Sequence, residues 1–323
     1  MILAGDIGAT HARLGLFAPE CPTPTCVEVL ASREFSGLDQ IIAAFRAQHP
    51  DPVHAACFAL PGPVYAGRIT ATNLGWSAEE AAIARQLGLP QVCFLNDLEA
   101  VGHGLETLTA AEILTLNPGA PDAKGNIAIL RAGSGLGEAG CFWDGVQHRP
   151  FACEGGHADF APRSDLEFAL CRELRAEMDH VSAERLLSGP GLVRLYQFFC
   201  ARDQGTEPES LTAELTSRPQ SERIVRAGLD GTSERCAQCL ELFAGVFAAE
   251  AGNLALKLMA RGGVYLGGGV AEGILPLLRR PAFMREFLNK GRMSSLMQSM
   301  PVYMILNPLV GLAGAAHFAA TRQ

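Results

Sequence analysis

Apolar and polar positions alternate in short blocks over the first third of the chain. Apolar runs at residues 2–5 and 13–17 flank a turn of small residues, which predicts a β-hairpin. Strands that alternate with helices after this hairpin predict an α/β fold with a mixed sheet. The further expected elements are strands over residues 27–35, 54–60 and 91–95, a helix over residues 38–48, a helix opened by a capping box at residues 77–80 and closed by Gly88, and a helix over residues 98–108.

The rest of the chain carries longer helical patterns around a second pair of short strands. The strand–glycine–strand unit near residue 5 recurs near residue 133, which indicates two related halves. The expected elements are strands over residues 126–130 and 263–266, helical segments over residues 164–205, with Pro190 in a first turn, and 234–260, and a polar surface excursion over residues 203–222.

These patterns predict two domains of unequal size. We expect a small α/β domain over residues 1–107, to which residues 302–323 return, and a large α/β domain over residues 108–301. Residues 301–320 carry no charge, but Pro301 and Pro308 interrupt them. We therefore expect a short strand, a turn and a buried helix there, and no membrane span.

The amino-acid composition argues against some classes of binding partner. Of the 323 residues, 48% are apolar and 19% are charged, as in globular proteins. Twenty-six basic residues against 34 acidic ones give a net charge of −8, which argues against nucleic acid as the main partner. No run of five basic residues is present in the sequence, so attraction to an acidic membrane surface is not expected either.

The ten cysteines are scattered along the chain. The first residues show neither a cationic start nor a long apolar stretch, so we expect no signal peptide, reduced thiols and a cytoplasmic location. Cys236 and Cys239 form a lone C-x-x-C inside a helical pattern. This context favours two ordinary thiols over a metal site.

A turn of small residues, GDIGAT at residues 5–10, joins the first two expected strands. Small residues let main-chain N–H groups approach a phosphate, and Thr10 adds a hydroxyl donor. Asp6 could hold Mg²⁺, directly or through water. A plain tight hairpin also needs glycine, so this turn alone leaves both interpretations open.

A second glycine-rich turn, GSGLG at residues 133–137, also follows an expected strand. It overlaps a G-x-G-x-x-G pattern, but a dinucleotide fingerprint must open a helix, and the apolar residues 141–143 continue as a strand. The sequence contains no Walker A motif either. Two phosphate-sized turns, one in each half, instead suit a cleft between two related domains.

Asn96 and Asp97 follow an apolar strand and precede a helix. Carboxylates at the carboxyl end of a sheet strand tend to face a ligand crevice, whereas both residue types also cap helices. The two interpretations are compatible, because one residue of the pair can cap the helix while the other faces a substrate.

Glu154 and His157 flank two glycines. The E-x-x-H spacing occurs in metal sites on helices, but adjacent glycines disfavour a helix and the sequence offers no partner motif. A carboxylate and an imidazole on a bare turn suit polyol hydroxyls better. His180 and Glu184 offer similar groups, although an ordinary helix start, with Ser182 as the cap and Glu184 in solvent, is somewhat favoured by chemistry alone.

Taken together, these motifs make the sequence similar to the bacterial glucokinases, in the hexokinase-like group that lacks the cysteine-rich zinc motif of the repressor/kinase family. The resemblance spans nearly the whole chain in the family's order, and the two motifs at 154–162 and 180–191 are far more specific than any glycine turn. The motifs that carry it are GDIGATHARL at 5–14, LNDLEA at 95–100, AGSGLG at 132–137, EGGHADFAP at 154–162, HVSAERLLSGPG at 180–191 and LGGGV at 266–270.

The resemblance implies a two-domain actin-like ATPase (ribonuclease H-like) fold, with an interdomain cleft, that phosphorylates glucose at the 6-hydroxyl with ATP and Mg²⁺. A homodimer is the expected assembly. By analogy Asp97 is the general base, and Asp6 serves Mg²⁺ through water. The residues implied for glucose are Asn96, Asp97, Glu154, His157 and Glu184; those implied for the nucleotide are Gly5, Asp6, Gly8, Thr10, Gly133, Ser134, Gly135, Gly137, Gly267 and Gly268.

The chain departs from the family's usual pattern on the nucleotide side. Ala9 and His11 stand where glycine and asparagine are usual, Arg131 replaces a glycine, and Glu138 replaces a small apolar residue. Every sugar-side residue is intact. The leading hypothesis is therefore an ATP-dependent glucokinase, and the alternative is a catalytically weak, sugar-binding sensor with altered nucleotide turns.

Overall fold

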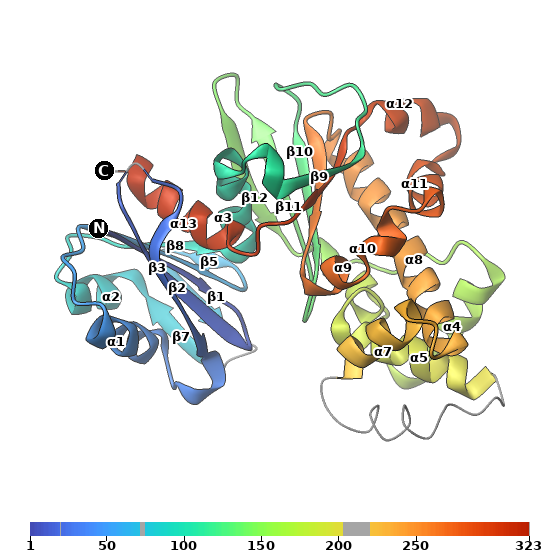
Figure 1. The fold of residues 1–323 in the computed structure, drawn as a ribbon, viewed down its shortest axis with the longest axis horizontal. Coiled ribbons are helices and arrows are strands. Elements are labelled where there is room, and N and C mark those ends of the chain that lie inside the picture. The colour runs from blue at the N-terminus through green and yellow to red at the C-terminus, as the bar shows by residue number, and fades with distance from the viewer. Residues whose placement is uncertain (20, 72–74, 203–219, 323) are drawn as a thin grey trace. The chain divides into compact units, whose positions relative to one another are not determined.

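The computed structural model describes residues 1–19, 21–71, 75–202 and 220–322, and the chain clusters into two compact units (Figure 1). Unit 1 comprises Met1–Glu112, Arg149–Ala152 and Asn307–Gln323, and unit 2 comprises Ile113–His148 and Cys153–Leu306. Most of the polar excursion expected over residues 203–222 lies outside the described residues.

Unit 1 is built on a sheet of five strands: β1 (Ile2–Ile7), β2 (His11–Phe17), β3 (Pro24–Ala31), β4 (Ala55–Leu60) and β8 (Cys93–Asn96). Their order in the sheet is β3-β2-β1-β4-β8. The expected hairpin of β1 and β2 is confirmed, and β3 adds to β2 in antiparallel direction. β4 and β8 run parallel to β1, which makes the sheet mixed as expected.

Alternate residues of the strands point to opposite faces of this sheet, and helices cover both faces (Figure 1). On one face α1 (Leu38–Gln48) and α2 (Glu80–Leu87) bury Phe45 and Ile83 with Phe58 of β4. On the other face α3 (Asp97–Gly104) and α13 (Val310–Thr321) pack small side chains around Ala59, the next residue of β4. The smaller elements of unit 1 are η1 (Ser32–Glu34), η2 (Leu105–Thr107), η3 (Ala110–Glu112), β5 (Val64–Tyr65), β6 (Arg68–Ala71) and β7 (Trp76–Glu79).

Unit 2 repeats this strand order. Its sheet consists of β9 (Ile113–Asn117), β10 (Ile127–Ala132), β11 (Leu136–Trp143), β12 (His148–Cys153), β13 (Gly263–Gly267) and β14 (Val302–Ile305), in the order β12-β11-β10-β13-β14-β9. β10 pairs antiparallel with β11 and parallel with β13, as β1 pairs with β2 and β4, and β14 follows parallel to β13. The recurrence of the strand–glycine–strand unit is therefore part of a larger structural repeat, to which β9 adds an antiparallel edge.

The core of unit 2 centres on a long helix, α8 (Glu234–Leu258), which begins with a side-chain cap from Ser233. Its apolar residues pack with β10, β13 and neighbouring helices. Cys236 and Cys239 are both buried in this core, as expected for ordinary thiols. The remaining elements are α4 (Asp165–Glu177), α5 (Gly189–Arg202), α7 (Gln220–Leu229), α9 (Gly269–Gly273), α10 (Leu275–Leu278), α11 (Pro281–Leu288), α12 (Ser294–Ser299), η4 (Gly155–His157), η5 (Ala183–Arg185) and η6 (Gly291–Met293).

Two local predictions in unit 1 are wrong. Residues 77–79 do not open a helix with a capping box: they belong to β7, where Ser77 pairs with Thr70 of β6, and α2 begins at Glu80 without a side-chain cap. The strand expected to reach residue 35 ends at Ala31, because Ser32 turns the chain into η1. Gly88 does close α2, in the left-handed conformation with φ 68°.

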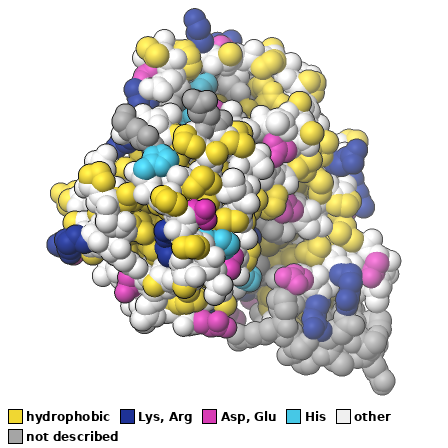
Figure 2. Space-filling view, turned by 60° about the vertical axis from the view of Figure 1, so that its left-hand side comes forward, with side chains coloured by type: hydrophobic (Ala, Val, Ile, Leu, Met, Phe, Trp, Pro, Cys, Tyr) yellow, Lys and Arg dark blue, Asp and Glu magenta, His cyan; other side chains and the backbone are white. Residues whose placement is uncertain are grey.

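Surface charge and apolar segments agree with the composition. On the face drawn in Figure 2, lysine and arginine side chains of the described residues are interspersed with acidic and apolar ones.

Within the described part of the chain, α8 has the length and apolar character of a membrane-crossing helix, and 67% of its apolar window is buried inside the structure. A core helix passes the same test. The stretch over residues 301–320 forms β14, a turn and α13, as expected.

Candidate active site

The turn between β1 and β2 is braced from one side by Ser32. The Ser32 hydroxyl donates to the main-chain oxygen of Gly8 at 2.7 Å, and its N–H donates to the oxygen of Thr10 at 3.1 Å. The Gly8 N–H donates to the oxygen of His11 at 2.9 Å. Ser32 is fully buried, so it fixes the turn from beneath. Sequence reasoning missed this residue, because the contact joins segments 24 residues apart.

Two of the residues predicted for the nucleotide lie in β1 just before this turn. The Asp6 carboxylate lies 4.0 Å from the Arg13 guanidinium, and its Oδ2 lies 3.2 Å from the position of a Cβ on Gly311, at the start of α13. Gly5 has a packing reason for its identity, because a Cβ there would lie 2.6 Å from the Phe58 ring.

Asn96 and Asp97 are each expected from the sequence either to cap a helix or to face a ligand, and Asn96 is the cap. Asn96 caps α3: its Oδ1 accepts from the Leu98 and Glu99 amides at 2.9 and 3.3 Å, and its Nδ2 donates to the Gly62 oxygen at 3.2 Å. Glu99 completes a capping box by accepting from the Asn96 amide at 3.1 Å. Asp97 is the first residue of α3, where the helix dipole stabilises a carboxylate.

Asp6 and Asp97 lie at the same edge of the sheet of unit 1. Asp6 pairs with Ala59 of β4, and Ala59 pairs with Leu95 of β8, two residues before Asp97. Two strand spacings separate β1 from β8, which corresponds to roughly 10 Å. Both acidic residues thus lie at the carboxyl ends of parallel strands, the edge at which open α/β sheets commonly bind ligands.

In unit 2 the glycine-rich turn is tied to Glu184. The Leu136 N–H donates to Glu184 Oε2 at 3.0 Å, and a Cβ on Gly135 would lie 2.5 Å from the same oxygen. The Gly133 oxygen accepts from the Gly189 amide at 2.8 Å. The expectation that Glu184 is only solvated is wrong, and Ser182 makes no side-chain cap at η5.

Glu154 and His157 lie on a single 3₁₀ turn, η4, and the absence of an α-helix there is confirmed. Both side chains are more than half exposed, with the His157 Nε2 3.9 Å from the Glu154 Oε2. His180 holds the turn from the next segment: its Nε2 lies 2.8 Å from the His157 main-chain oxygen, and its Nδ1 lies 3.3 Å from the Asp159 carboxylate.

Further main-chain bonds join the turn to the segment that carries Glu184. The Phe160 N–H donates to the Val181 oxygen at 2.9 Å, and the Ala183 N–H donates to the Ala158 oxygen at 3.0 Å. The residues predicted to bind sugar from unit 2 therefore come from two hydrogen-bonded segments, 27 positions apart for His157 and Glu184.

Gly267 and Gly268 end β13 beside the end of β10. Gly267 pairs with Arg131, whose Nε lies 3.3 Å from the position of a Cβ on Gly267. Gly268 has φ 93°, and a Cβ there would lie 2.3 Å from the Ala132 oxygen, so glycine is required. The two predicted nucleotide segments of unit 2 thus meet at one sheet edge, with the Arg131 side chain over Gly267.

No metal cluster accompanies these residues. The described part of the chain contains no group of three or more His, Cys, Asp or Glu side chains placed to hold an ion, so the Glu154–His157 pair has no such set around it. Mg²⁺ needs less, because it keeps several waters and binds through one or two carboxylates and substrate phosphates. Asp6, with its partly exposed carboxylate, fits that requirement.

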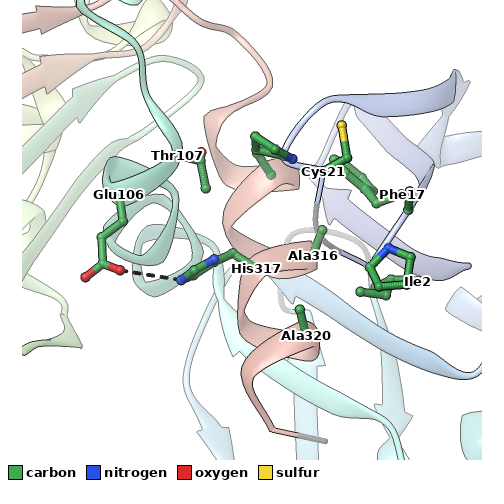
Figure 3. A pocket seen from close by; sticks show the side chains of 12 residues that line it. Ile2, Phe17, Cys21, Glu106, Thr107, Ala316, His317 and Ala320 are labelled. Atoms are coloured by element: carbon green, nitrogen blue, oxygen red, sulfur yellow. Dashed lines mark ion pairs between the residues drawn. The ribbon is translucent and has the colours of Figure 1, made fainter.

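A separate cavity of about 270 Å³ lies in unit 1 (Figure 3). Its lining residues include Ile2, Phe17 and the ion pair of Glu106 and His317, whose atoms lie 3.4 Å apart. Ile2 and Phe17 are paired at the end of the β1–β2 hairpin opposite the turn. Five residue steps, roughly 17 Å, separate that end from the predicted phosphate turn, so this cavity is not part of it.

Comparison with known proteins places these features in a family. A family model described as glucokinase matches residues 3–322. The chain is 38% identical to a glucokinase of Trichormus variabilis over 99% of both chains, and 34% identical to a glucokinase of Yersinia pestis over 98% of this chain and 95% of that one.

Solved structures agree with the sequence relatives. A glucokinase from an Antarctic psychrotroph superimposes with a TM-score of 0.83 at 28% identity, covering 99% of this chain and 98% of that one. A glucokinase of the ROK family from Streptomyces griseus, in complex with glucose and AMPPNP, shares the fold with a TM-score of 0.70 at 21% identity over 99% of both chains. The expected actin-like ATPase fold is confirmed, and the chain belongs to the glucokinase family.

Proposed function

We propose that this chain transfers the γ-phosphoryl group of ATP to the 6-hydroxyl of glucose, with Asp97 as the general base. The observation that carries the proposal is the position of Asp97 at the start of α3, on the sheet edge that also carries Asp6. Phosphoryl transfer needs an aligned acceptor and charge stabilisation more than covalent help. Asp97 would align the acceptor hydroxyl, and Asp6 would stabilise charge through Mg²⁺.

On the sugar side, Asp97 would accept the proton of the 6-hydroxyl as the hydroxyl oxygen attacks. The Leu98 amide, at the start of α3, donates to Asp97 Oδ1 at 3.1 Å. Glu154, His157 and Glu184 would bind the remaining hydroxyls. Asn96 would contribute mainly by capping α3, with the second hydrogen of its Nδ2 available to the sugar.

On the nucleotide side, the braced turn at residues 8–10 and the glycine turn at residues 133–137 would bind the phosphates through the Thr10 hydroxyl and through main-chain N–H groups other than those of Gly8 and Gly133, which donate to the His11 and Gly135 oxygens. Gly267 and Gly268 would lie beside the adenosine. Asp6 would hold Mg²⁺, through water, and the ion when bound neutralises charge on the phosphate oxygens. A Streptomyces griseus relative solved with glucose and AMPPNP supports this pair of ligands.

Asp97→Asn tests the assignment. The amide keeps the size of the side chain but cannot accept the proton, so kcat should fall by ~10²- to 10⁴-fold while glucose affinity by calorimetry stays near that of the parent. The matched control is Asp165→Asn, because Asp165 is the first residue of α4 and also faces helix amides. An unchanged kcat in Asp97→Asn would remove Asp97 as the base.

The same assay separates the enzyme from the sensor hypothesis. The proposal requires the parent to form glucose 6-phosphate from glucose and MgATP, with ADP and polyphosphate as alternative donors in parallel reactions. Glucose binding without turnover by any donor would favour the sensor, which no comparison supports.

A cytoplasmic location and a homodimeric assembly are also proposed. None of the ten cysteines, all of which lie in the described residues, forms a disulfide, which supports a reducing compartment such as the cytoplasm. The homodimer stays a prediction, which sedimentation analysis of the pure protein tests.

A further inference from the structure

Glu138 is an acidic side chain enclosed behind the turn that carries Glu154 and His157. It belongs to β11, opposite Leu130 of β10, and only 2% of its surface is exposed. Its Oε1 is buried and has no hydrogen-bond partner among the described residues. A buried carboxyl oxygen without a partner is costly, and such an atom in a native structure calls for an explanation beyond packing.

Glu138 contacts the turn at Gly155. A Cβ on Gly155 would lie 2.0 Å from Glu138 Oε2 and 2.8 Å from its Cδ, so only glycine lets the turn lie on this carboxyl. Cys153 joins the same two segments: its Sγ donates to the Glu138 main-chain oxygen at 3.3 Å and accepts from the Gly155 amide. The side chain and the main chain of Glu138 therefore both support the turn.

The turn cannot relax toward the sheet. A Cβ on Gly156 would lie 2.1 Å from the Leu136 oxygen, so the main chain already approaches β11 as closely as a glycine allows. Any water or counter-ion recruited by an ionised Glu138 must displace the turn outward. Glu154 and His157, on either side of the two glycines, would move with it.

Two charged groups of α8 and a thiol of β12 lie around Glu138. Glu250 and Lys257 of α8 act in opposite directions on its ionisation, and the Cys153 thiol lies on the β12 side. Burial, followed by the repulsion of Glu250, raises the pKa of Glu138 to about 7, while Lys257 lowers it. The carboxyl therefore changes charge in the range where a cellular kinase works.

We propose that Glu138 is a positioning residue for the Glu154–His157 turn, and that the turn holds its sugar-binding arrangement while the Glu138 carboxyl is protonated. This inference rests on the proposed function, because it needs Glu154 and His157 to bind glucose. Glu138 then affects glucose binding without touching the substrate. Glucose binding also becomes dependent on pH, which the sugar contacts alone do not require.

The expected effect is a loss of glucose affinity as pH rises. If only the protonated form is competent, the apparent Kd scales inversely with the protonated fraction, and a titration centred near pH 7 raises Kd by about tenfold between pH 6 and pH 8. Calorimetry of glucose binding without nucleotide measures this effect free of the titration of ATP.

Glu138→Gln tests the inference most directly. It keeps the shape of the side chain and stays neutral, so glucose Kd should remain near the parent's pH 6 value throughout, and the tenfold rise should disappear. Glu138→Met, which fills the same space without polar atoms, should also give a flat profile. A pH profile in Glu138→Gln that matches the parent's would overturn the inference.

Two neighbouring charges give a directional control. Glu250→Gln should move the midpoint of the parent profile to lower pH, because it removes a repulsive charge, and Lys257→Met should move it to higher pH. A residue with a purely structural role would show no such opposite shifts. Lys257 is more than half exposed, so its substitution leaves the core intact.

The outcome also distinguishes this inference from the proposed function. If Glu154→Gln leaves glucose affinity unchanged, the turn does not bind sugar and the proposed function fails with respect to it. If Glu154→Gln weakens glucose binding while the parent's Kd is independent of pH, the sugar site stands and the role of Glu138 is refuted.

Discussion

The carboxylate of Glu184 accepts a hydrogen bond from the main-chain amide of Leu136, with 3.0 Å between Oε2 and N. This bond joins the turn proposed for the nucleotide to a side chain proposed for the sugar, both within unit 2. Glu184 therefore holds the start of β11 in place, in addition to the contact with sugar that we propose for it. A charged acceptor makes this bond stronger than an ordinary amide–carbonyl bond.

Substitution of Glu184 should separate the two functions. Glu184→Gln keeps a carbonyl oxygen for Leu136 but loses the charge toward sugar, so KM for glucose should rise about tenfold or more with little change in KM for ATP. Glu184→Ala removes both bonds and should raise both KM values. Steady-state kinetics of both variants give these KM values. An equal rise of KM for ATP in Glu184→Gln and Glu184→Ala would contradict the proposed anchoring of the turn.

Asp6→Asn should raise the Mg²⁺ concentration needed for half-maximal activity and lower kcat, because an amide is a weaker ligand than a carboxylate for a hard cation. Glucose affinity should stay near the parent's. A titration of activity with Mg²⁺ at fixed ATP gives both values. Unchanged Mg²⁺ dependence would separate Asp6 from the metal.

Local sequence patterns predicted the elements well wherever a periodicity or a cap is decided by neighbours along the chain. The helix Leu38–Gln48 has the bounds expected, and Asn96 caps α3 as its residue type allowed. The capping box at residues 77–80 was misleading, because a strand pairing with β6 outweighed the local cap preference of Ser77.

The sequence alone could not reveal contacts between distant segments. Ser32 braces a turn 24 residues away, and Glu184 accepts from an amide 48 residues away. From the sequence, Glu138 is noted only as a nucleotide-side departure in place of a small apolar residue, and its burial behind the Glu154–His157 turn is not predicted. Its position behind Gly155 follows from the register of β11 and the path of η4, which only the fold specifies.

Burial of Glu138 predicts a stability that falls with pH. The unfolded chain releases this proton near its ordinary value of 4.5 and the native chain near 7, so between these values the native state binds more protons than the unfolded state. The free energy of unfolding therefore decreases as pH rises through this window, by up to about 3 kcal/mol, and changes no further above it.

Glu138→Met removes that titration. Its advantage in unfolding free energy over the parent should grow from pH 5 to pH 8, as read from urea unfolding at each pH. Glu250→Gln, which keeps Glu138, serves as the comparison and should retain most of the parent's dependence. An advantage of the same size at both pH values would mean that Glu138 is not protonated in the native state near neutrality.

Substitution by alanine should have different effects at Gly155 and Gly156, the two glycines of the Glu154–His157 turn. In Gly156→Ala the new methyl meets the Leu136 main-chain oxygen, which cannot move without breaking the β11 strand, so glucose affinity and stability should both fall sharply. In Gly155→Ala the methyl meets the Glu138 side chain, at 2.0 Å from Oε2, 2.8 Å from Cδ and 3.3 Å from Cβ, and no main-chain atom is among these three nearest contacts. Glu138→Ala should therefore rescue glucose binding in the Gly155→Ala variant but not in the Gly156→Ala variant, and equal rescue of both would contradict this geometry.

Arg131 is one of the residues on the nucleotide side that depart from the family's usual pattern. The Arg131 side chain lies over Gly267 at the sheet edge proposed for the adenosine and phosphates, so its cation is placed to add a contact with the nucleotide. Arg131→Gly should therefore raise KM for ATP several-fold, with a smaller effect at high salt because the charge is then screened. KM for glucose should stay the same.

Ala9 lies on the braced turn between Gly8 and Thr10, where a methyl can misalign a phosphate, and displacements near 1 Å can cost ~10²-fold in rate. Ala9→Gly should raise kcat only modestly if Ser32 already holds the turn in a productive shape. Both substitutions act on the proposed nucleotide, so the double variant measures whether their effects on ATP kinetics are coupled. Glucose binding without turnover in the parent, unrescued by Ala9→Gly with Arg131→Gly, would instead mean that these turns no longer support phosphoryl transfer.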